Sequence, residues 1–117
     1  MSGPGAAAVF AALGDPVRQR LLDLLAAGPA TASQLHPAVG ITRQAVAQQL
    51  AVLQDAGLVS RQRHGREVRF AVVPAGLVPA REHLDRLGAA WEDHLAAIKR
   101  AAEGDAAGAG QVQGQGR

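Results

Sequence analysis

The sequence lacks cysteine altogether, and it has no long uninterrupted apolar run. With no cysteine among its 117 residues, the chain can form no disulfide, no thiolate metal site, no thiol redox switch and no cysteine nucleophile. The longest apolar stretch near the N-terminus, Ala6–Leu13, is too short to span a bilayer, and no Lys or Arg precedes it as in a secretory signal. We therefore expect a cytoplasmic protein that does not enter a membrane.

Recognisable catalytic motifs are also missing. The sequence contains no Ser-His-Asp arrangement, no paired catalytic carboxylates, no phosphate-binding glycine loop and no HExxH zinc motif. Asp15 stands close to Arg18 and Arg20, but a helix N-cap and a helix surface explain this group better than a catalytic cluster does. We therefore expect that the protein is not an enzyme and that it uses no cofactor.

The charged residues are unevenly distributed along the chain. The 12 basic and 10 acidic side chains give a net charge of only +2. Residues 40–73 nevertheless carry five arginines against Asp55 and Glu67, a net charge of +3, whereas residues 74–105 carry a net charge of −2. A basic central segment predicts a surface for polyanions, and a solvated face without a ligand is the alternative.

The hydrophobic pattern predicts a mainly α-helical chain with a small β-hairpin. We expect one domain over residues 6–103, between a flexible N-terminus at 1–5 and a disordered tail at 104–117. Residues 58–63 and 67–73 alternate in polarity around a glycine turn, which predicts the hairpin. The predicted helices cover residues 6–13, Pro16 to the break at Gly28-Pro29, 32–39, 43–56 and 79–102, with Asp15, Thr31 and Thr42 as N-caps.

Two short helices, a tight turn at Gly40 and an arginine-bearing hairpin follow one another in the order of a winged helix-turn-helix. The helix predicted over 43–56 has one apolar face, formed by Val46, Leu50 and Leu53. Its opposite face carries small Ala47 and Ala51, which allow the helix to enter a DNA major groove about 12 Å wide. The pattern therefore predicts that this helix and the hairpin bind double-stranded DNA.

The candidate DNA contacts lie on this helix and on the hairpin. Glutamine pairs bidentately with adenine, so Gln44 and Gln48 are candidate base readers, and Arg43 can reach guanine or a phosphate. Thr42, together with the N-terminal N–H groups of the helix, suits a phosphate oxygen. His64 at the hairpin tip is either a phosphate ligand or a solvated side chain. The hairpin offers three arginines to the phosphate backbone or the minor groove, namely Arg61, Arg63 and Arg66.

Four motifs, in this order and spacing, resemble the ArsR/SmtB family of bacterial winged-helix repressors. Residues 12–18 (ALGDPVR) are similar to the ALGDPTR opening of that family, and residues 41–50 (ITRQAVAQQL) resemble its recognition helix. Residues 54–59 (QDAGLV) resemble its exit into the wing, and residues 91–95 (WEDHL) are similar to the FWDERL ending of one subgroup. The resemblance covers residues 6–103 and implies a winged helix-turn-helix that dimerises through its first and last helices.

The resemblance also implies a function. It implies a homodimeric, sequence-specific transcriptional repressor that binds an inverted repeat and holds two recognition helices about 34 Å apart, one turn of DNA. Trp91 is a candidate for stacking on a small aromatic effector or for packing on an apolar stripe. The sequence does not identify an effector. The implied dimer seam is that stripe on the last helix, formed by Leu84, Leu87, Trp91, Leu95 and Ile98.

Metal sensing is well known in this family, but the family's ligand positions are mostly substituted here. The cysteine-pair site would fall near His36, where the chain has no thiolate. A second family site, on the last helix, would use His83 and His94, but Arg81 and Ala97 stand where their partner ligands should be. We therefore expect repression without a metal. The alternatives are a histidine-based metal-responsive repressor and a protein-interaction module that kept the fold.

Overall fold

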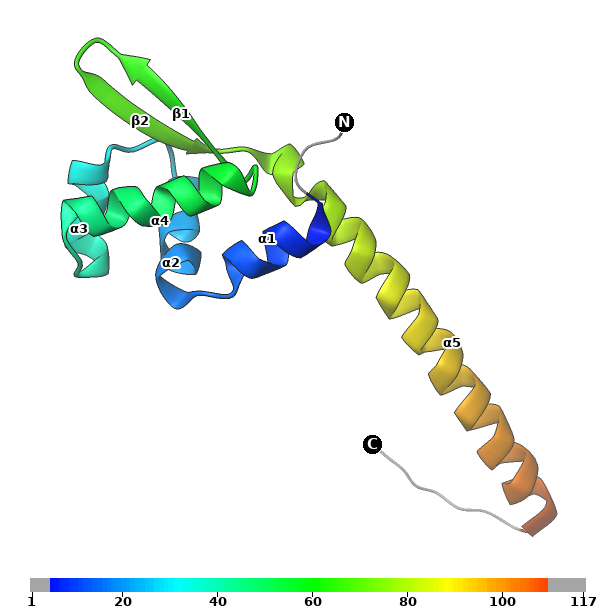
Figure 1. The fold of residues 1–117 in the computed structure, drawn as a ribbon. Coiled ribbons are helices and arrows are strands. Elements are labelled where there is room, and N and C mark those ends of the chain that lie inside the picture. The colour runs from blue at the N-terminus through cyan, green and yellow to red at the C-terminus, as the bar shows by residue number, and fades with distance from the viewer. Residues whose placement is uncertain (1–4, 110–117) are drawn as a thin grey trace. The chain divides into compact units, whose positions relative to one another are not determined.

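The computed structural model describes residues 5–109 and, for side-chain environments, residues 5–104. Helices predominate, and one antiparallel hairpin is present (Figure 1), which confirms the predicted fold class. The contacts divide the chain into two units, Met1–His83 and Leu84–Arg117, with the boundary inside the last helix. The elements are α1 (Ala6–Leu13), α2 (Pro16–Ala26), α3 (Ala32–Val39), α4 (Arg43–Asp55), β1 (Val59–His64), β2 (Glu67–Val72), the 3-10 helix η1 (Pro74–Leu77) and α5 (Val78–Ala109).

Three helices of the first unit, α2, α3 and α4, start directly after the residues that the sequence predicts as N-caps. Asp15 and Thr42 each accept a hydrogen bond from a backbone N–H of the following turn, at 3.1 and 3.0 Å. Thr31 and Gln34 form a reciprocal capping box, with hydrogen bonds of 3.1 and 2.8 Å. Gly40 ends α3 with a φ of 72°, a left-handed conformation that glycine adopts without strain. Local side-chain chemistry therefore fixes the turn between α3 and α4.

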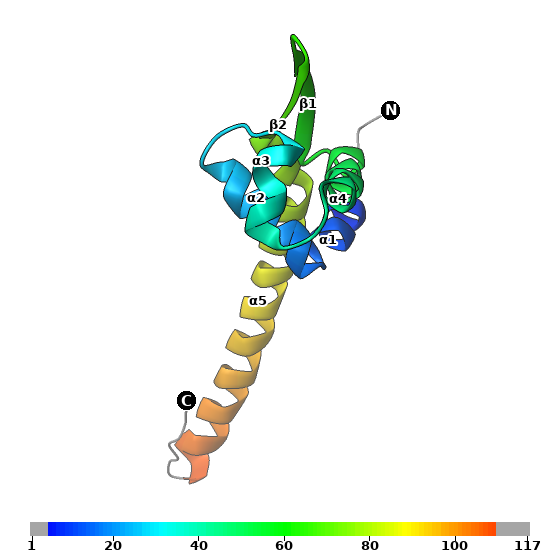
Figure 2. The ribbon, with the colours of Figure 1, turned by 90° about the vertical axis from the view of Figure 1, so that its left-hand side faces the viewer.

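The core of the first unit lies among α1, α2, α3, α4 and the base of the hairpin, while the hairpin tip projects away from these helices (Figures 1 and 2). The centre of the core is built by α2 and α4, whose residues Leu21, Leu25, Val46, Leu50 and Leu53 are at most 1% exposed. Three of these lie on α4 at helical spacing, as predicted. Their burial fixes the rotation of α4 about its axis.

The hairpin is anchored on the outer edge of β2. β1 and β2 pair in antiparallel register along their whole length, and the turn consists of Gly65 and Arg66. Gly65 has a φ of +65°, as the first turn residue of a two-residue hairpin of type II′ requires. On the outer edge of β2, Phe70 exchanges two backbone hydrogen bonds with Ala30, of 2.8 and 3.0 Å. This bridge ties the hairpin to the segment that enters α3.

Gly76 of η1 packs against the turn that joins α4 to β1. A Cβ atom at Gly76 would overlap the carbonyl oxygen of Gly57 and lie 2.8 Å from its carbonyl carbon, and neither backbone atom can move without its neighbours. The variant Gly76→Ala is therefore expected to lower the free energy of unfolding by about 1–3 kcal/mol or more. Urea denaturation measures this loss.

A matched glycine in an open position serves as the control for this prediction. A Cβ atom at Gly104 of α5 would meet nothing within 4 Å, so Gly104→Ala should stabilise the helix by at most about 1 kcal/mol. Equal urea midpoints for Gly76→Ala and the unchanged protein would contradict the close approach of η1 to the turn.

The helix α5 is longer than the sequence pattern predicts. It begins at Val78 and continues to Ala109, so it enters the segment that was expected to be a disordered tail from residue 104. Alanine has the highest helix propensity, and the alanines of residues 101–109 outweigh Gly104 and Gly108. Residues 1–4 and 110–117 lie outside the described residues. No helix in the described part of the chain has the length and apolarity needed to cross a membrane.

Candidate nucleic-acid interface

The outward face of α4 carries the side chains predicted to read bases. Because the opposite face is buried in the core, Gln44 and Gln48 are turned to solvent, and both are exposed. Ala47 and Ala51, which the same face carries, are also exposed and end at Cβ. Small alanine side chains therefore lie beside the polar glutamines on this face, so the helix backbone can come close to the floor of a DNA groove.

The first residues of α4 lie beside the start of α3. Thr42 uses one lone pair of its hydroxyl oxygen to cap α4, and its O–H can still donate outward. Arg43 Nη1 donates a hydrogen bond of 3.0 Å to Ser33 Oγ on α3, and its other guanidinium N–H groups remain free to donate to a ligand. Ser33 is absent from the predicted set, because this pairing depends on how the two helices pack.

One face of the hairpin is turned toward the helices, and it carries two of the predicted arginines. Arg61 and Arg63 are two positions apart on β1, so their side chains leave the strand on the same side. They stand opposite Phe70 and Val68 of β2. Because Phe70 is buried and is part of the core cluster, this side is the inner face of the wing.

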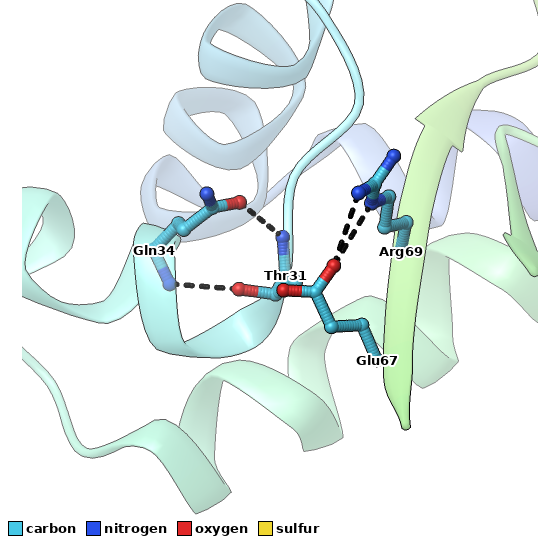
Figure 3. A network of polar contacts seen from close by, with 4 residues as sticks. All are labelled: Thr31, Gln34, Glu67 and Arg69. Atoms are coloured by element: carbon cyan, nitrogen blue, oxygen red, sulfur yellow. Dashed lines mark hydrogen bonds and ion pairs between the residues drawn. The ribbon is translucent and has the colours of Figure 1, made fainter. Parts of the chain in front are cut away.

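The outer face of the hairpin holds an arginine that is already paired. Arg69 Nη2 and Nε donate to Glu67 Oε1 at 3.0 and 3.2 Å (Figure 3). An exposed ion pair of this kind stabilises a fold by about 0–1 kcal/mol, but it partly neutralises Arg69 toward a polyanion. Among the side chains of residues 5–104 no other ion pair is found. No paired carboxylate in this range therefore offsets the positive charge of Arg61, Arg63 or Arg66.

A groove of about 330 Å³ runs between α4 and the wing. It brings Arg61 of β1 to the outward face of α4, where Ala47 and Ala51 form part of the wall. Gln54 also lines this groove and is exposed, although it is not among the predicted residues. It lies one helical turn beyond Ala51 on the same stripe, so helical periodicity alone could have identified it.

The second unit carries an apolar stripe on α5. Leu84, Trp91, Leu95 and Ile98 are 53 to 63% exposed, while Leu87 is half-buried. Trp91 is the most exposed of these residues. A stripe of large exposed apolar side chains on one helix is typical of a surface that another polypeptide covers.

The candidate metal ligands do not form a cluster within the described residues. His83 and His94 are both exposed on α5. The His83 ring meets Phe10 of α1 edge-on, with ring centroids 5.7 Å apart. No group of three or more His, Cys, Asp or Glu side chains in residues 5–104 is arranged to hold a metal ion.

The chain is similar in sequence to known transcriptional regulators. A family model described as a helix-turn-helix domain matches residues 13–62, a range that contains all of α2, α3 and α4. The regulator CmtR of Mycobacterium tuberculosis is 36% identical over 96 residues, which are 81% of this chain and 81% of that protein. The NMR structure of CmtR is described as that of a cadmium metal-sensor.

Solved structures of regulators share the fold. An ArsR-like transcriptional regulator from Rhodococcus sp. RHA1 matches with a TM-score of 0.73 at 41% identity, covering 83% of this chain and 92% of that chain. The homodimeric winged helix-turn-helix domain of Mb0332 from Mycobacterium bovis, described as a possible ArsR-family regulator, matches with a TM-score of 0.55 at 28% identity. That match covers 76% of each chain.

Proposed function

Since this chain belongs to the ArsR family of winged helix-turn-helix, DNA-binding transcriptional regulators, we propose that it is a homodimeric repressor of transcription. In this proposal it acts in the cytoplasm and binds an inverted-repeat operator in double-stranded DNA without a metal ion. The observation that carries the proposal is the groove in which the outward face of α4 meets Arg61 of the wing. Its relatives are regulators and not enzymes, which fits a surface built for binding alone.

The two sides of the interface have different roles in this proposal. Gln44 and Gln48 contact base edges in the major groove, because their amide groups can donate and accept toward adenine. Arg43, anchored on Ser33, reaches guanine or a phosphate from the start of α4. The wing holds the phosphate backbone or the groove edge and supplies affinity that does not depend on sequence. Thr42 on α4 and the wing residues Arg61, Arg63 and Arg66 form this phosphate-binding group.

A selection on random fragments of genomic DNA tests the proposal directly. Purified protein is mixed with a fragment library of genomic DNA, and the retarded fragments are recovered and sequenced. Enrichment of an inverted repeat with half-site centres about one turn apart would support the homodimeric repressor. Absence of retardation even at low salt would favour the alternative, a protein-interaction module that kept the fold.

Two single substitutions are expected to separate base reading from phosphate binding. Gln48→Ala should weaken binding to the selected operator by about 5- to 150-fold, corresponding to 1–3 kcal/mol, and should leave binding to a scrambled duplex nearly unchanged. Arg66→Ala should weaken both by similar factors, because a phosphate contact carries no sequence information. Fluorescence anisotropy with the two duplexes measures both ratios. Equal losses from both substitutions on both duplexes would contradict the assignment of Gln48 to base reading and of Arg66 to phosphate binding.

Metal-independent binding is part of the proposal and has its own test. CmtR is a described cadmium sensor, but this chain has no cysteine, and His83 and His94 lack carboxylate partners at the family's positions. Zinc or cadmium is titrated into the operator complex of the unchanged protein and of His83→Ala. Release of DNA by metal that His83→Ala abolishes would establish the histidine-based metal-responsive repressor instead.

A further inference from the structure

One arginine side chain connects α1, α2 and α4. Arg18 lies in the first turn of α2, and its Nε donates to the carbonyl oxygen of Ala12 at 2.7 Å, while its Nη2 donates to that of Ala11 at 3.2 Å. Both acceptors are in the last turn of α1. The third donor, Nη1, makes a hydrogen bond of 2.9 Å to Gln49 Oε1 on α4. The end of α1 and the recognition helix are thus joined through a single guanidinium group.

The chemistry of this contact requires arginine. The last carbonyl groups of α1 lack the donors of a further helical turn and form the negative end of its dipole, so a cation that donates to them is stabilising. The carbonyl oxygen of Ala11 also accepts from the N–H of Gly14 at 3.3 Å. The guanidinium is planar, and its N–H groups diverge, so it can serve two carbonyls and an amide oxygen together. Arg18 and Gln49 are both half-buried, where reduced solvent competition strengthens hydrogen bonds.

We propose that Arg18 and Gln49 form a positioning pair that holds α4 in the register needed to read bases. Burial of the apolar face fixes the rotation of α4, but apolar contacts are not directional. The hydrogen bond from Arg18 fixes where α4 stands along its axis relative to α1. Gln49 follows the proposed base reader Gln48 directly, so a shift at one displaces the other. The inference rests on the proposed function, because it assigns how the same DNA-binding site is held in place.

Among the described residues, the side chain of the next residue of α2 hydrogen-bonds to the end of α1 alone. Gln19 makes a similar hydrogen bond to the end of α1, of 2.7 Å to the carbonyl oxygen of Leu13, but no hydrogen bond of its side chain to α4 is found in the described residues. This difference supplies a matched control.

The first test is binding of the unchanged protein and its variants to two duplexes. One is the operator enriched by the unchanged protein, and the other is a scrambled duplex of equal length. Gln49→Ala is expected to lower operator affinity about tenfold, the effect of losing a hydrogen bond to a charged group, and to change scrambled affinity less than about twofold. Gln19→Ala should leave both affinities unchanged. An operator-to-scrambled ratio that Gln49→Ala does not alter would overturn the positioning role.

A double-mutant cycle decides whether the two residues act together. Arg18→Lys keeps the charge but lacks the fork, so it should also lower the operator-to-scrambled ratio. The double variant with Gln49→Ala should bind no more weakly than the weaker single variant, because both substitutions remove the same hydrogen bond. Additive losses would overturn the pair.

The contact is also measured without DNA, which separates it from the proposed function. In NMR hydrogen-exchange experiments on the free protein, Gln49→Ala should speed exchange of the Arg18 Nη1–H groups, which lose their acceptor, and of amides in α4, while Gln19→Ala should leave both unchanged. Should the unchanged protein bind no duplex, the proposed function fails, and this arm still decides the pair. Faster exchange in Gln49→Ala supports the pair, and unchanged exchange overturns it.

Discussion

Affinity for the operator is expected to fall by about 10⁴-fold when the salt concentration rises from 50 to 200 mM. Each chain presents Arg61, Arg63 and Arg66 on the wing without an ion-pair partner among the described side chains, and Thr42 and Arg43 at the start of α4. A dimer that contacts about eight phosphates releases the counterions held there, so log K should fall against log salt with a slope near −7. Titrations by fluorescence anisotropy at five salt concentrations measure the slope.

Two arginines of the same hairpin provide the control for this prediction. Arg61 lies on the inner face and lines the groove beside α4, so Arg61→Ala should reduce the slope by about 1 for each phosphate that the variant no longer neutralises. Arg69 lies on the outer face and donates to Glu67, so Arg69→Ala should leave the slope unchanged. A flat salt dependence of the unchanged protein would contradict a DNA interface built on these arginines. Equal slopes for the two variants would contradict the assignment of the inner face.

The parts of the fold that local chemistry decides were predictable from the sequence. A cap joins a side chain to a backbone N–H three residues away, so Asp15, Thr31 and Thr42 could be identified without knowledge of the tertiary fold. The buried face of α4 follows from helical periodicity, and the outward position of Gln44 and Gln48 follows from that face. These features place most of the candidate interface.

The contacts that the sequence did not predict join segments that are distant along the chain. Arg18 meets Gln49, and Ala30 pairs with Phe70, only because of how the helices and the hairpin pack. Alternation along β1 separates the strand into two faces, but the burial of Phe70 decides which face is turned toward the helices. The alternation in the sequence predicts which residues share a face of the hairpin, but only the packing of the fold determines which face is turned toward the helices.

The helix α5 ends later than the sequence pattern predicts, for a different reason. Gly104 is a poor helix former, and the composition from residue 104 onward indicates disorder. The alanines on both sides of Gly104 favour the helix, which continues to Ala109. A residue-by-residue reading of helix breakers underestimates a helix that is already long, because extending it costs much less than starting it.

The variant Leu95→Asp is expected to raise the dissociation constant of the dimer by about 10³-fold. Leu95 is 59% exposed in one chain, and burial of a leucine side chain is worth about 1.5–3 kcal/mol. In a two-fold symmetric interface each substitution acts twice. The dimer then has to bury the two added carboxylates, which is costly, or separate the two α5 helices at this point. Sedimentation velocity across a concentration series measures the dimer.

A substitution on the opposite side of the same helix is the matched control. At 100° per residue, Ala89 lies far from the stripe of Leu84, Trp91 and Leu95, and it is also exposed. Ala89→Asp adds the same charge to α5 but should leave the dimer intact. Equal dissociation by both variants, or a monomeric unchanged protein, would contradict the proposed seam.

Measurements of DNA binding distinguish loss of the dimer in Leu95→Asp from unfolding of the variant. A monomeric Leu95→Asp protein keeps α4 and the wing, so it should still bind scrambled duplex, with a salt slope reduced to about half because half of the phosphate contacts remain. Its operator affinity should fall by about 100-fold or more, because a dimer binds both half-sites of an inverted repeat at once, whereas a monomer binds only one. An unfolded variant would lose both activities together. A halved slope with strongly reduced operator affinity therefore identifies α5 as the element that converts two weak DNA contacts into one specific complex.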